Sequence, residues 1–156
     1  MDVWPVSTQF AAEFLNANHP LRAGGSLRGS IVSLAGFEDG WPTFLAVFVY
    51  PRSRWKHYPV VLELSRLAWS PMAKHSAATF LRKCIRRLRQ EFSGLVVTYA
   101  LPGTEGILYR RAGFYESGTS GGASWSRRGP GERPTPRTIG TGKRLKRFFV
   151  ELKAED

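Results

Sequence analysis

The sequence predicts one mixed α/β (α+β) domain, and three observations lead to this fold class. The chain has 156 residues, enough for one ordinary domain and too few for two. Apolar segments of strand length alternate with segments of helical periodicity, which favours a sheet-and-helix domain over a bundle or a sandwich. Hydrophobic residues make up 42% and charged residues 22% of the chain, as in ordinary globular proteins. We therefore expect a single domain over residues 1–156.

The N-terminal elements follow from spacing and from turn residues. Residues 7–17 place four apolar side chains at helical spacing after Ser or Thr as an N-cap. Strands are predicted at 30–35 and 44–50, separated by a turn over 36–42 that contains Gly, Asp and Pro. A longer strand is predicted at 60–69, because prolines bound it on both sides.

The C-terminal half begins with the clearest helix, over 76–92, which has one apolar face and one face with five Lys and Arg residues. A strand at 95–100 and a short helix at 104–112 follow, and Phe114 begins another strand or turn. In 117–142, 18 of 26 residues are Gly, Pro, Ser or Thr, which predicts a basic loop. A basic C-terminal strand is predicted over 143–152.

The charge balance is the most informative feature of the composition. Twenty-three Lys and Arg residues against twelve Asp and Glu give a net charge of +11. Such a field attracts polyanions, namely nucleic acid, acidic membrane surfaces or phosphorylated small molecules. No apolar run approaches the roughly 18 residues of a membrane span, and the N-terminus does not read as a secretory signal. One cysteine and three scattered histidines predict no disulfide and no metal site, so we expect a cytoplasmic protein without membrane contact.

The segment 60–92 carries the first functional hint, because a strand leads through a short loop into a helix that opens with Ser76-Ala-Ala. Backbone N–H groups at a helix start can bind phosphate, and small side chains allow a close approach. Lys74 would add positive charge there. The alternative is an ordinary strand–helix turn with a serine cap.

Further along the chain, the strand around 96–99 is followed by Gly106-Ile-Leu-Tyr-Arg-Arg-Ala-Gly-Phe114. This order resembles the GNAT superfamily of acyl-CoA-dependent N-acetyltransferases. The resemblance implies a GNAT-like fold, with a central mixed, mostly antiparallel sheet flanked by helices and splayed strands forming an acyl-CoA cleft. It also implies a pyrophosphate loop after the fourth strand. Residues 72–77 depart from the usual Arg/Gln-x-x-Gly-x-Gly/Ala pattern of that loop because they contain no glycine.

A narrower resemblance rests on Glu63-Leu-Ser-Arg-Leu67, Val97-Thr-Tyr-Ala100, Gly113-Phe114 before Gly118-Thr119, and the basic run 142–148. Over roughly residues 14 to 150 the chain looks like the Mom family. These are phage-borne GNAT-like proteins that add a carbamoylmethyl group to the exocyclic amine of adenine in DNA. The resemblance implies a phage-encoded DNA-modification enzyme that protects DNA from restriction in the cytoplasm of the bacterial host.

Two positions depart from the Mom pattern. Pro20 follows His19 where the family often has a tyrosine, and Leu101 stands where it commonly has an aspartate. Two alternatives therefore stay open. One is an acyl-CoA-dependent N-acetyltransferase that acts on a small-molecule or protein amine, and the other is a non-catalytic, basic nucleic-acid-binding protein on a GNAT scaffold.

Three residues are candidates for proton transfer. By resemblance, Tyr109 reprotonates the leaving thiolate, because the phenol pKa of about 10 lies above that of a thiol. Glu63 would accept a proton from the amine, and His19 is a second candidate base. The alternatives are a core tyrosine, an ion pair within the sheet and an exposed loop histidine. Strict strand alternation places Glu63 and Ser65 on one face of the sheet and Arg66 on the other.

The expected cofactor is acetyl-CoA or another acyl-CoA, and the expected partner is DNA, with a homodimer left open. The pantetheine arm would lie beside Leu67, Ala68 and Trp69, and the pyrophosphate on the backbone of Ala73, Lys74, His75, Ser76 and Ala77. The basic face of the 76–92 helix is expected to be a solvated surface. Basic side chains that track phosphates, and aromatic ones that stack on an extruded base, are the nucleic-acid candidates. They are Arg66, Tyr99, Trp125, Arg127, Arg128, Lys143, Arg144, Lys146 and Arg147.

Overall fold

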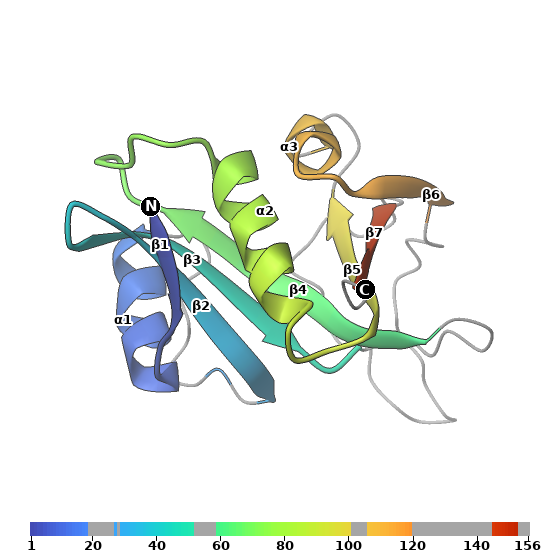
Figure 1. The fold of residues 1–156 in the computed structure, drawn as a ribbon, viewed down its shortest axis with the longest axis horizontal. Helices are drawn as coiled ribbons and strands as arrows, with labels where there is room; N and C mark the ends of the chain where they lie inside the picture. Colours follow the sequence, from blue (N-terminus) through green and yellow to red (C-terminus); the bar gives the residue numbers. More distant parts are fainter. Residues whose placement is uncertain (19–26, 28, 52–58, 101–105, 120–144, 153–156) are drawn as a thin grey trace, which may run out of the picture.

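A computed structural model describes residues 1–18, 27, 29–51, 59–100, 106–119 and 145–152. Within these ranges the chain forms three helices and one seven-stranded sheet (Figure 1). The helices are α1 (Thr8–Asn18), α2 (Ala77–Leu88) and α3 (Gly106–Arg111). The strands are β1 (Asp2–Pro5), β2 (Ser30–Glu38), β3 (Trp41–Val49), β4 (Val60–Trp69), β5 (Gly94–Ala100), β6 (Tyr115–Thr119) and β7 (Lys146–Leu152).

The strand order is β1-β2-β3-β4-β5-β7-β6. Every neighbouring pair is antiparallel except β4 and β5, which run parallel, so the predicted mixed, mostly antiparallel sheet is confirmed. Strand β1 is not predicted by any pattern in the sequence. This strand is four residues long and forms by pairing with β2, which a local pattern cannot reveal.

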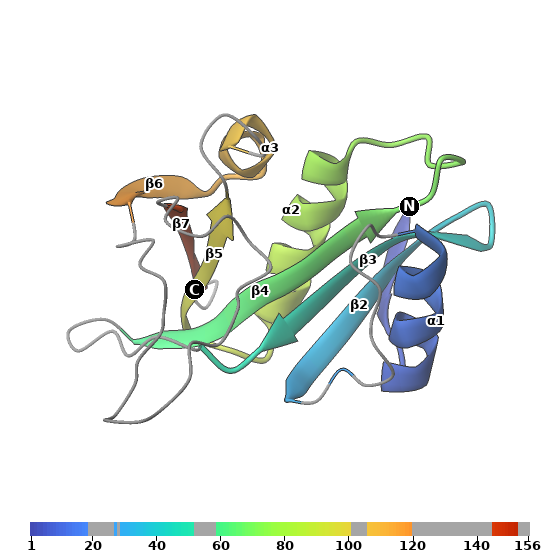
Figure 2. The ribbon, with the colours of Figure 1, turned by 180° about the vertical axis from the view of Figure 1, so that it is seen from behind.

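Helices cover both faces of the sheet, α2 on the face toward the viewer in Figure 1 and α1 on the opposite face, nearer in Figure 2. The α2 side holds the larger core, where Phe80 stacks on Phe44 with ring centroids 5.0 Å apart. The α1 side holds a smaller core that includes Phe14 and Leu15. The apolar spacing in both helices therefore marks the faces that pack on the sheet.

Both long helices begin with the predicted serine cap. The Ser7 hydroxyl accepts from the backbone amide of Phe10 at 3.1 Å, and the Ser76 hydroxyl from that of Thr79 at 3.1 Å. Such caps pair one of the amides that a helix start leaves open. Helix α2 ends at Leu88, four residues before the predicted end, although Phe92 still packs against the α2-side core.

The β2–β3 hairpin is tighter than predicted, because two residues make the turn in place of the segment 36–42. Asp39 and Gly40 have φ angles of 51° and 81°, the left-handed conformation that Asp-Gly turns of type I′ require. Strand β2 therefore continues to Glu38, and β3 begins at Trp41. This register carries Glu38 to the tip of the sheet.

Strands β4 and β5 are held together at their starts and part at their ends. The ladder joins Val60 to Leu95 and ends at the pair Glu63 and Val97. Beyond that pair β4 stays with β3 as far as Trp69, whereas β5 stays with β7 as far as Ala100. Figure 1 shows the two arrowheads pointing apart. The expected splay is confirmed.

Gly94 fixes the close start of the β4–β5 pair. Its φ is +124°, and an added Cβ would lie 2.4 Å from the carbonyl oxygen of Pro59. The next residue, Leu95, donates its backbone N–H to that carbonyl at 2.8 Å. Only glycine allows this approach together with this backbone conformation.

Candidate functional site

A bulge in β4 decides which side chains share a face beside the gap. Arg66 is paired with Val47 and Leu64 with Phe48, so β4 carries one extra residue between these pairs. Glu63 is paired with Val49. Because directly paired residues project to the same side, Glu63 and Arg66 both lie on the α1 face of the sheet. The prediction from strict alternation, which separated them, is wrong.

The same face continues across β5 and β7. Val97 is the neighbour of Glu63, and Tyr99 follows two residues later, opposite Arg147 of β7. The alternate residues of β5, Val96 and Ala100, belong to the α2-side core. Glu63, Arg66, Tyr99 and Arg147 therefore share one sheet face around the point where β4 and β5 separate.

This group of four side chains is shielded to different degrees. Glu63 is 8% exposed, and the other three are partly buried. The guanidinium of Arg147 donates to the carbonyl oxygen of Ser117 at 3.4 Å. In Figure 2, α1 lies on this same face but over the β2–β3 part of the sheet, away from β5 and β7. A nearly buried carboxylate with two arginines and a phenol can bind a polar acceptor and accept a proton from it.

The loop over residues 70–76, which joins β4 to α2, is organised by a buried carboxylate that no sequence pattern indicates. Glu38 is 6% exposed. Its carboxylate accepts from the backbone amides of Lys74 at 3.1 Å and His75 at 2.8 Å, and from the hydroxyl of Thr43 at 2.5 Å. The ring Nδ1 of His75 makes a further contact with it. A contact across 37 residues of sequence leaves no local signal.

Burial alone would raise the pKa of Glu38, because it disfavours the charged form. Hydrogen bonds from Thr43, from the ring and backbone of His75, and from the backbone of Lys74 outweigh that effect and lower the pKa to about 2. Glu38 is therefore a carboxylate at neutral pH, bound where a phosphate group was expected.

Most of the predicted phosphate-binding amides already have partners within the chain. Ala73 donates its N–H to the carbonyl oxygen of Ser70 at 3.0 Å, and those of Lys74 and His75 bind Glu38. What remains is the first turn of α2, the amides of Ser76, Ala77 and Ala78, which a helix cannot pair internally.

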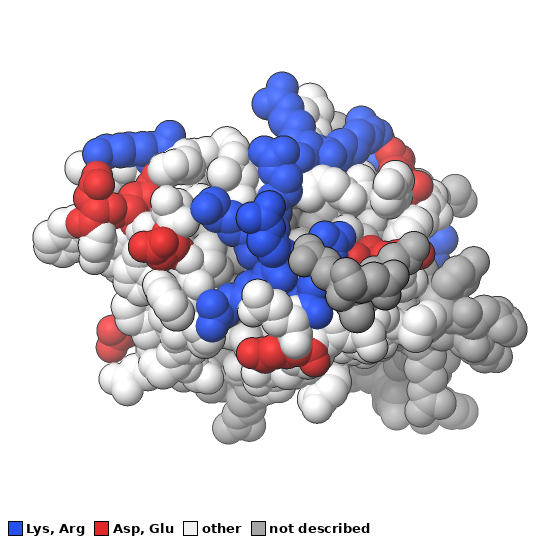
Figure 3. All heavy atoms as spheres, viewed as in Figure 1, with Lys and Arg blue, Asp and Glu red and all other residues white. Residues whose placement is uncertain are grey.

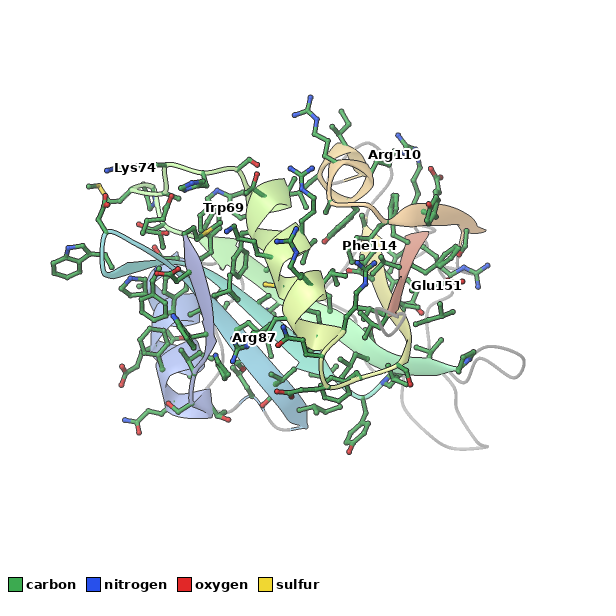
Figure 4. All side chains as sticks on the ribbon, in the orientation of Figure 1. Trp69, Lys74, Arg87, Arg110, Phe114 and Glu151 are labelled. Atoms are coloured by element: carbon green, nitrogen blue, oxygen red, sulfur yellow. The ribbon has the colours of Figure 1, made fainter. Side chains whose placement is uncertain are left out.

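The Lys74 ammonium lies 2.8 Å from the carboxylate of Asp39 (Figure 4 labels Lys74). A hydrogen bond from Lys74 and its positive charge lower the pKa of Asp39, and the same pair raises the pKa of Lys74. The cation that was expected to serve a phosphate is thus paired with a carboxylate of the same hairpin that supplies Glu38.

The three residues predicted to line the pantetheine arm end β4. Leu67 packs against the α2-side core, Ala68 belongs to the α1-side core, and Trp69 is 42% exposed at the strand end (Figure 4). Their backbones pair with β3 on one side, and the β5 ladder does not extend to them. Among the described strands, their other backbone edge has no ladder partner, and their place beside the pantetheine arm stays a prediction.

Tyr109 is a core residue of α3. Its side chain is 3% exposed, and its ring centroid lies 5.7 Å from that of Phe114 and 5.3 Å from that of Phe148. The backbone amide of Phe114 donates to the Tyr109 carbonyl at 2.9 Å, across the left-handed Gly113. The Tyr–Gly–Phe signature thus closes α3 and seats Tyr109. Its role as a proton donor stays a prediction.

Several predicted positions lie outside the described residues. They are His19, Pro20, Leu101, Trp125, Arg127, Arg128, Lys143 and Arg144. Of the basic C-terminal segment, Lys146 and Arg147 lie in β7, where Lys146 is 3.8 Å from Glu116.

Over the described residues, no three His, Cys, Asp or Glu side chains gather as a metal site would require. Burial raises the pKa of the Cys84 thiol, whose side chain lies in the α2-side core. No helix in the described part of the chain is both long and apolar enough to span a membrane.

The fold matches that of solved GNAT acetyltransferases. An acetyltransferase from Bacillus subtilis in complex with CoA has a TM-score of 0.63 at 10% identity, over 96% of this chain and 97% of that chain. A GNAT family acetyltransferase from Elizabethkingia anophelis with acetyl-CoA bound has a TM-score of 0.64 at 13% identity, over 96% and 97%. The ribosomal-protein-S18-alanine N-acetyltransferase from Escherichia coli has 0.63 at 12% identity, over 99% and 96%. No protein-family profile and no curated protein matches the sequence. The predicted GNAT-like fold is confirmed.

Proposed function

We propose that this protein is an acyl-CoA-dependent N-acyltransferase. The observation that carries the proposal is the end of the β4–β5 ladder at Glu63 and Val97, in the middle of an otherwise continuous sheet. Two of the similar structures hold CoA or acetyl-CoA. A sheet opened between two parallel strands offers backbone N–H and C=O groups to an extended, amide-containing ligand.

The residues fit an acyl-CoA at the strand edges and depart from it at the phosphate end. The β4 edge from Leu67 to Trp69 would hold the pantetheine arm, and the amides of Ser76 and Ala77 would hold the pyrophosphate. When bound, an acyl-CoA would supply the acyl group as a thioester. The carboxylate of Glu38 occupies the two amides before Ser76, so fewer backbone donors would serve the phosphates than the predicted loop offered.

The proposed proton transfers use side chains from both faces of the sheet, next to the place where β4 and β5 separate. Glu63, on the α1 face, would accept a proton from the attacking amine, with Arg66 and Arg147 on the same face to orient the acceptor. Tyr109, packed on α3 in the α2-side core, would donate its phenolic proton to the departing thiolate.

For the acceptor we propose an amine in nucleic acid, and more finely the exocyclic amine of adenine in DNA. With an acyl-CoA, the amine nitrogen would form an amide bond to the acyl carbon while the carbon–sulfur bond breaks and CoA leaves as the thiol. The carbamoylmethyl group that the Mom resemblance implies is attached through a methylene carbon, so an acyl transfer of this kind does not form it. The Mom-like motifs around Glu63–Leu67 and Val97–Ala100 and the net charge of +11 support this choice of acceptor. An enzyme that acts on such an amine must flip the base or find it unpaired. A phage-encoded role in protecting DNA from restriction belongs to the same proposal.

An amine on a small molecule or protein is the second candidate acceptor. One of the similar structures is an N-acetyltransferase of a ribosomal protein. The carboxylate of Glu63 on the acceptor face would suit a cationic amine.

Calorimetric titration with acetyl-CoA and CoA tests the cofactor, and no heat at millimolar ligand would overturn the proposal. Mass spectrometry of nucleosides from cells that express the protein then tests the acceptor. A modified adenine that disappears in Tyr109→Phe and Glu63→Gln is the expected result. Acetyl-CoA binding without any modified nucleoside would favour the second acceptor class. Binding of DNA without acyl-CoA binding would favour the non-catalytic alternative.

A further inference from the structure

The outer face of α2 carries a dense group of cations, which we call the α2 face. Figure 3 shows basic side chains running down the middle of the molecule over α2 and continuing toward α3. Arg82 and Arg86 are exposed, and the other three are partly buried. The α2 face consists of Arg82, Lys83, Arg86, Arg87 and Arg89.

Three of these side chains are oriented by backbone carbonyl groups from distant parts of the chain. Lys83 donates to Met1 at 3.1 Å, and Arg87 donates to Val3 at 3.3 Å while its guanidinium lies 5.2 Å from the ring centroid of Trp4. Arg89 donates to the carbonyl of Glu151 at 3.1 Å. A carbonyl positions a cation without neutralising it. These charges are therefore held in place and remain available to an anion.

No member of the α2 face lies within 4.0 Å of a carboxylate of the described residues. Three other cations of the described chain, Lys74, Arg110 and Lys146, each pair with an acid. Like charges four residues apart on a helix destabilise it by a few tenths of a kcal/mol for each pair. The α2 face keeps two such pairs, 82 with 86 and 83 with 87, which a bound polyanion would relieve.

We propose that the α2 face binds the phosphate backbone of duplex DNA. Arg82 and Arg89 are seven residues apart, about 10 Å along the helix axis, which matches about three nucleotides of one strand. Single-stranded nucleic acid is usually held on exposed aromatic rings. Here the aromatic neighbour is Trp4, 55% exposed, and Arg87 already covers one face of its ring. The α2 face therefore fits a duplex backbone better than unpaired bases.

This inference rests on the proposed function only through the choice of a nucleic-acid acceptor. It differs from the expectation that the basic face of this helix is a solvated surface, and the experiment below decides between the two. It places the phosphate contacts on a helix on the opposite side of the sheet from Glu63 and Arg66. In this arrangement, DNA held on the α2 face would be positioned by its backbone and not read by sequence.

The test measures the affinity of the full chain for a fluorescent 20-base-pair duplex by anisotropy, without cofactor, over about 50 to 200 mM salt. The variant is Arg82→Gln/Arg86→Gln, whose side chains are exposed. Loss of two phosphate contacts should flatten the slope of log affinity against log salt by about 1.8. Over this fourfold salt range, the factor by which affinity falls should be about 12 times smaller for the variant than for the wild type.

The matched control is Lys74→Gln/Arg110→Gln, which removes the same net charge from two cations that already pair with carboxylates. Its salt slope should stay near that of the wild type. Equal changes in both double variants would overturn the proposal, because total charge would then explain binding. A single strand of the same length that binds as tightly, with the same response to Arg82→Gln/Arg86→Gln, would overturn the duplex assignment. Acyl-CoA titrations on the same variants separate this result from the proposed function.

Discussion

The loop before α2 and the outer face of α2 carry positive groups in opposite states. In the 70–76 loop, the amides of Lys74 and His75 bind Glu38, and the Lys74 ammonium binds Asp39. A few residues later, the α2 face presents five cations with no carboxylate beside them among the described residues. The comparison teaches that the attraction of a site for an anion depends on which of its donors are already used.

Of these two regions, the 70–76 loop is the one that the sequence predicts to bind an anion. It follows the predicted strand 60–69 and opens a helix with small residues, as a phosphate site would. The carboxylate that occupies it comes from a hairpin tip more than thirty residues earlier. Variants that change one region and keep the other as a reference can therefore separate the two.

The largest expected effect is on stability, from Glu38→Gln. The amide side chain keeps the shape of Glu38 but loses the charge that binds two backbone amides, so the free energy of unfolding should fall by about 2 kcal/mol at neutral pH. Urea unfolding measures it. Asp39→Asn is the control, because it removes an exposed ion pair of the same hairpin. A loss in Asp39→Asn as large as that in Glu38→Gln would show that the buried hydrogen bonds are not the cause.

The same variant should change how stability depends on pH. The pKa of Glu38 is lowered from 4.5 to about 2 in the folded protein, so its contribution is complete above about pH 4.5 and is lost as the pH falls toward 2. The stability difference between wild type and Glu38→Gln should therefore shrink across this window. Unfolding curves at intervals from pH 5 to 2 measure the difference. A constant difference would mean that the charge of Glu38 is not what binds the loop.

The next effect concerns the cofactor. Glu38→Gln removes a negative charge from the amides of Lys74 and His75 and so should raise the affinity for CoA, by about tenfold, equivalent to about 1.4 kcal/mol. Asp39→Asn changes the net charge equally but leaves those amides bound to Glu38. It should raise the affinity much less in the same calorimetric titration. An equal gain in CoA affinity in both variants would show that the change in net charge, and not the release of the two amides, is the cause.

The smallest effect is expected on the α2 face itself. Replacing Arg82 and Arg86 with Gln removes one like-charge pair at i, i+4 spacing. Without DNA, the free energy of unfolding should rise by about 0.3 kcal/mol. Differential scanning calorimetry at low salt is the measurement. A clear loss of stability would show that these arginines support the fold and are not held for a ligand.

The elements whose boundaries were predicted correctly are those that residues close in the sequence determine. Strand β4 matches its predicted range because prolines bound it, and α2 begins at the predicted cap because Ser76 precedes an apolar stripe. The Tyr–Gly–Phe signature indicated the GNAT-like fold by resemblance, and in the structure it closes the end of α3. These features depend on neighbours within a few residues.

The features that were missed depend on register and on distant contacts. Arg66 lies on the same face as Glu63 because of a bulge that only the pairing with β3 reveals. Strand β1 forms because β2 is there to pair with it. Glu38 lies within the turn predicted over 36–42, but the observed turn has only two residues, so Glu38 belongs to β2. Local patterns do not contain this information.

The most direct test of the contrast between the two regions is a crossed titration of Glu38→Gln and Arg82→Gln/Arg86→Gln with CoA and with duplex DNA. We predict that Glu38→Gln changes the affinity for CoA and leaves the salt slope of DNA binding near the wild-type value. Arg82→Gln/Arg86→Gln should flatten the salt slope and leave the affinity for CoA unchanged. If both variants altered the same ligand in the same way, the loop and the α2 face would form one anion site, and the functional separation of these two regions would be contradicted.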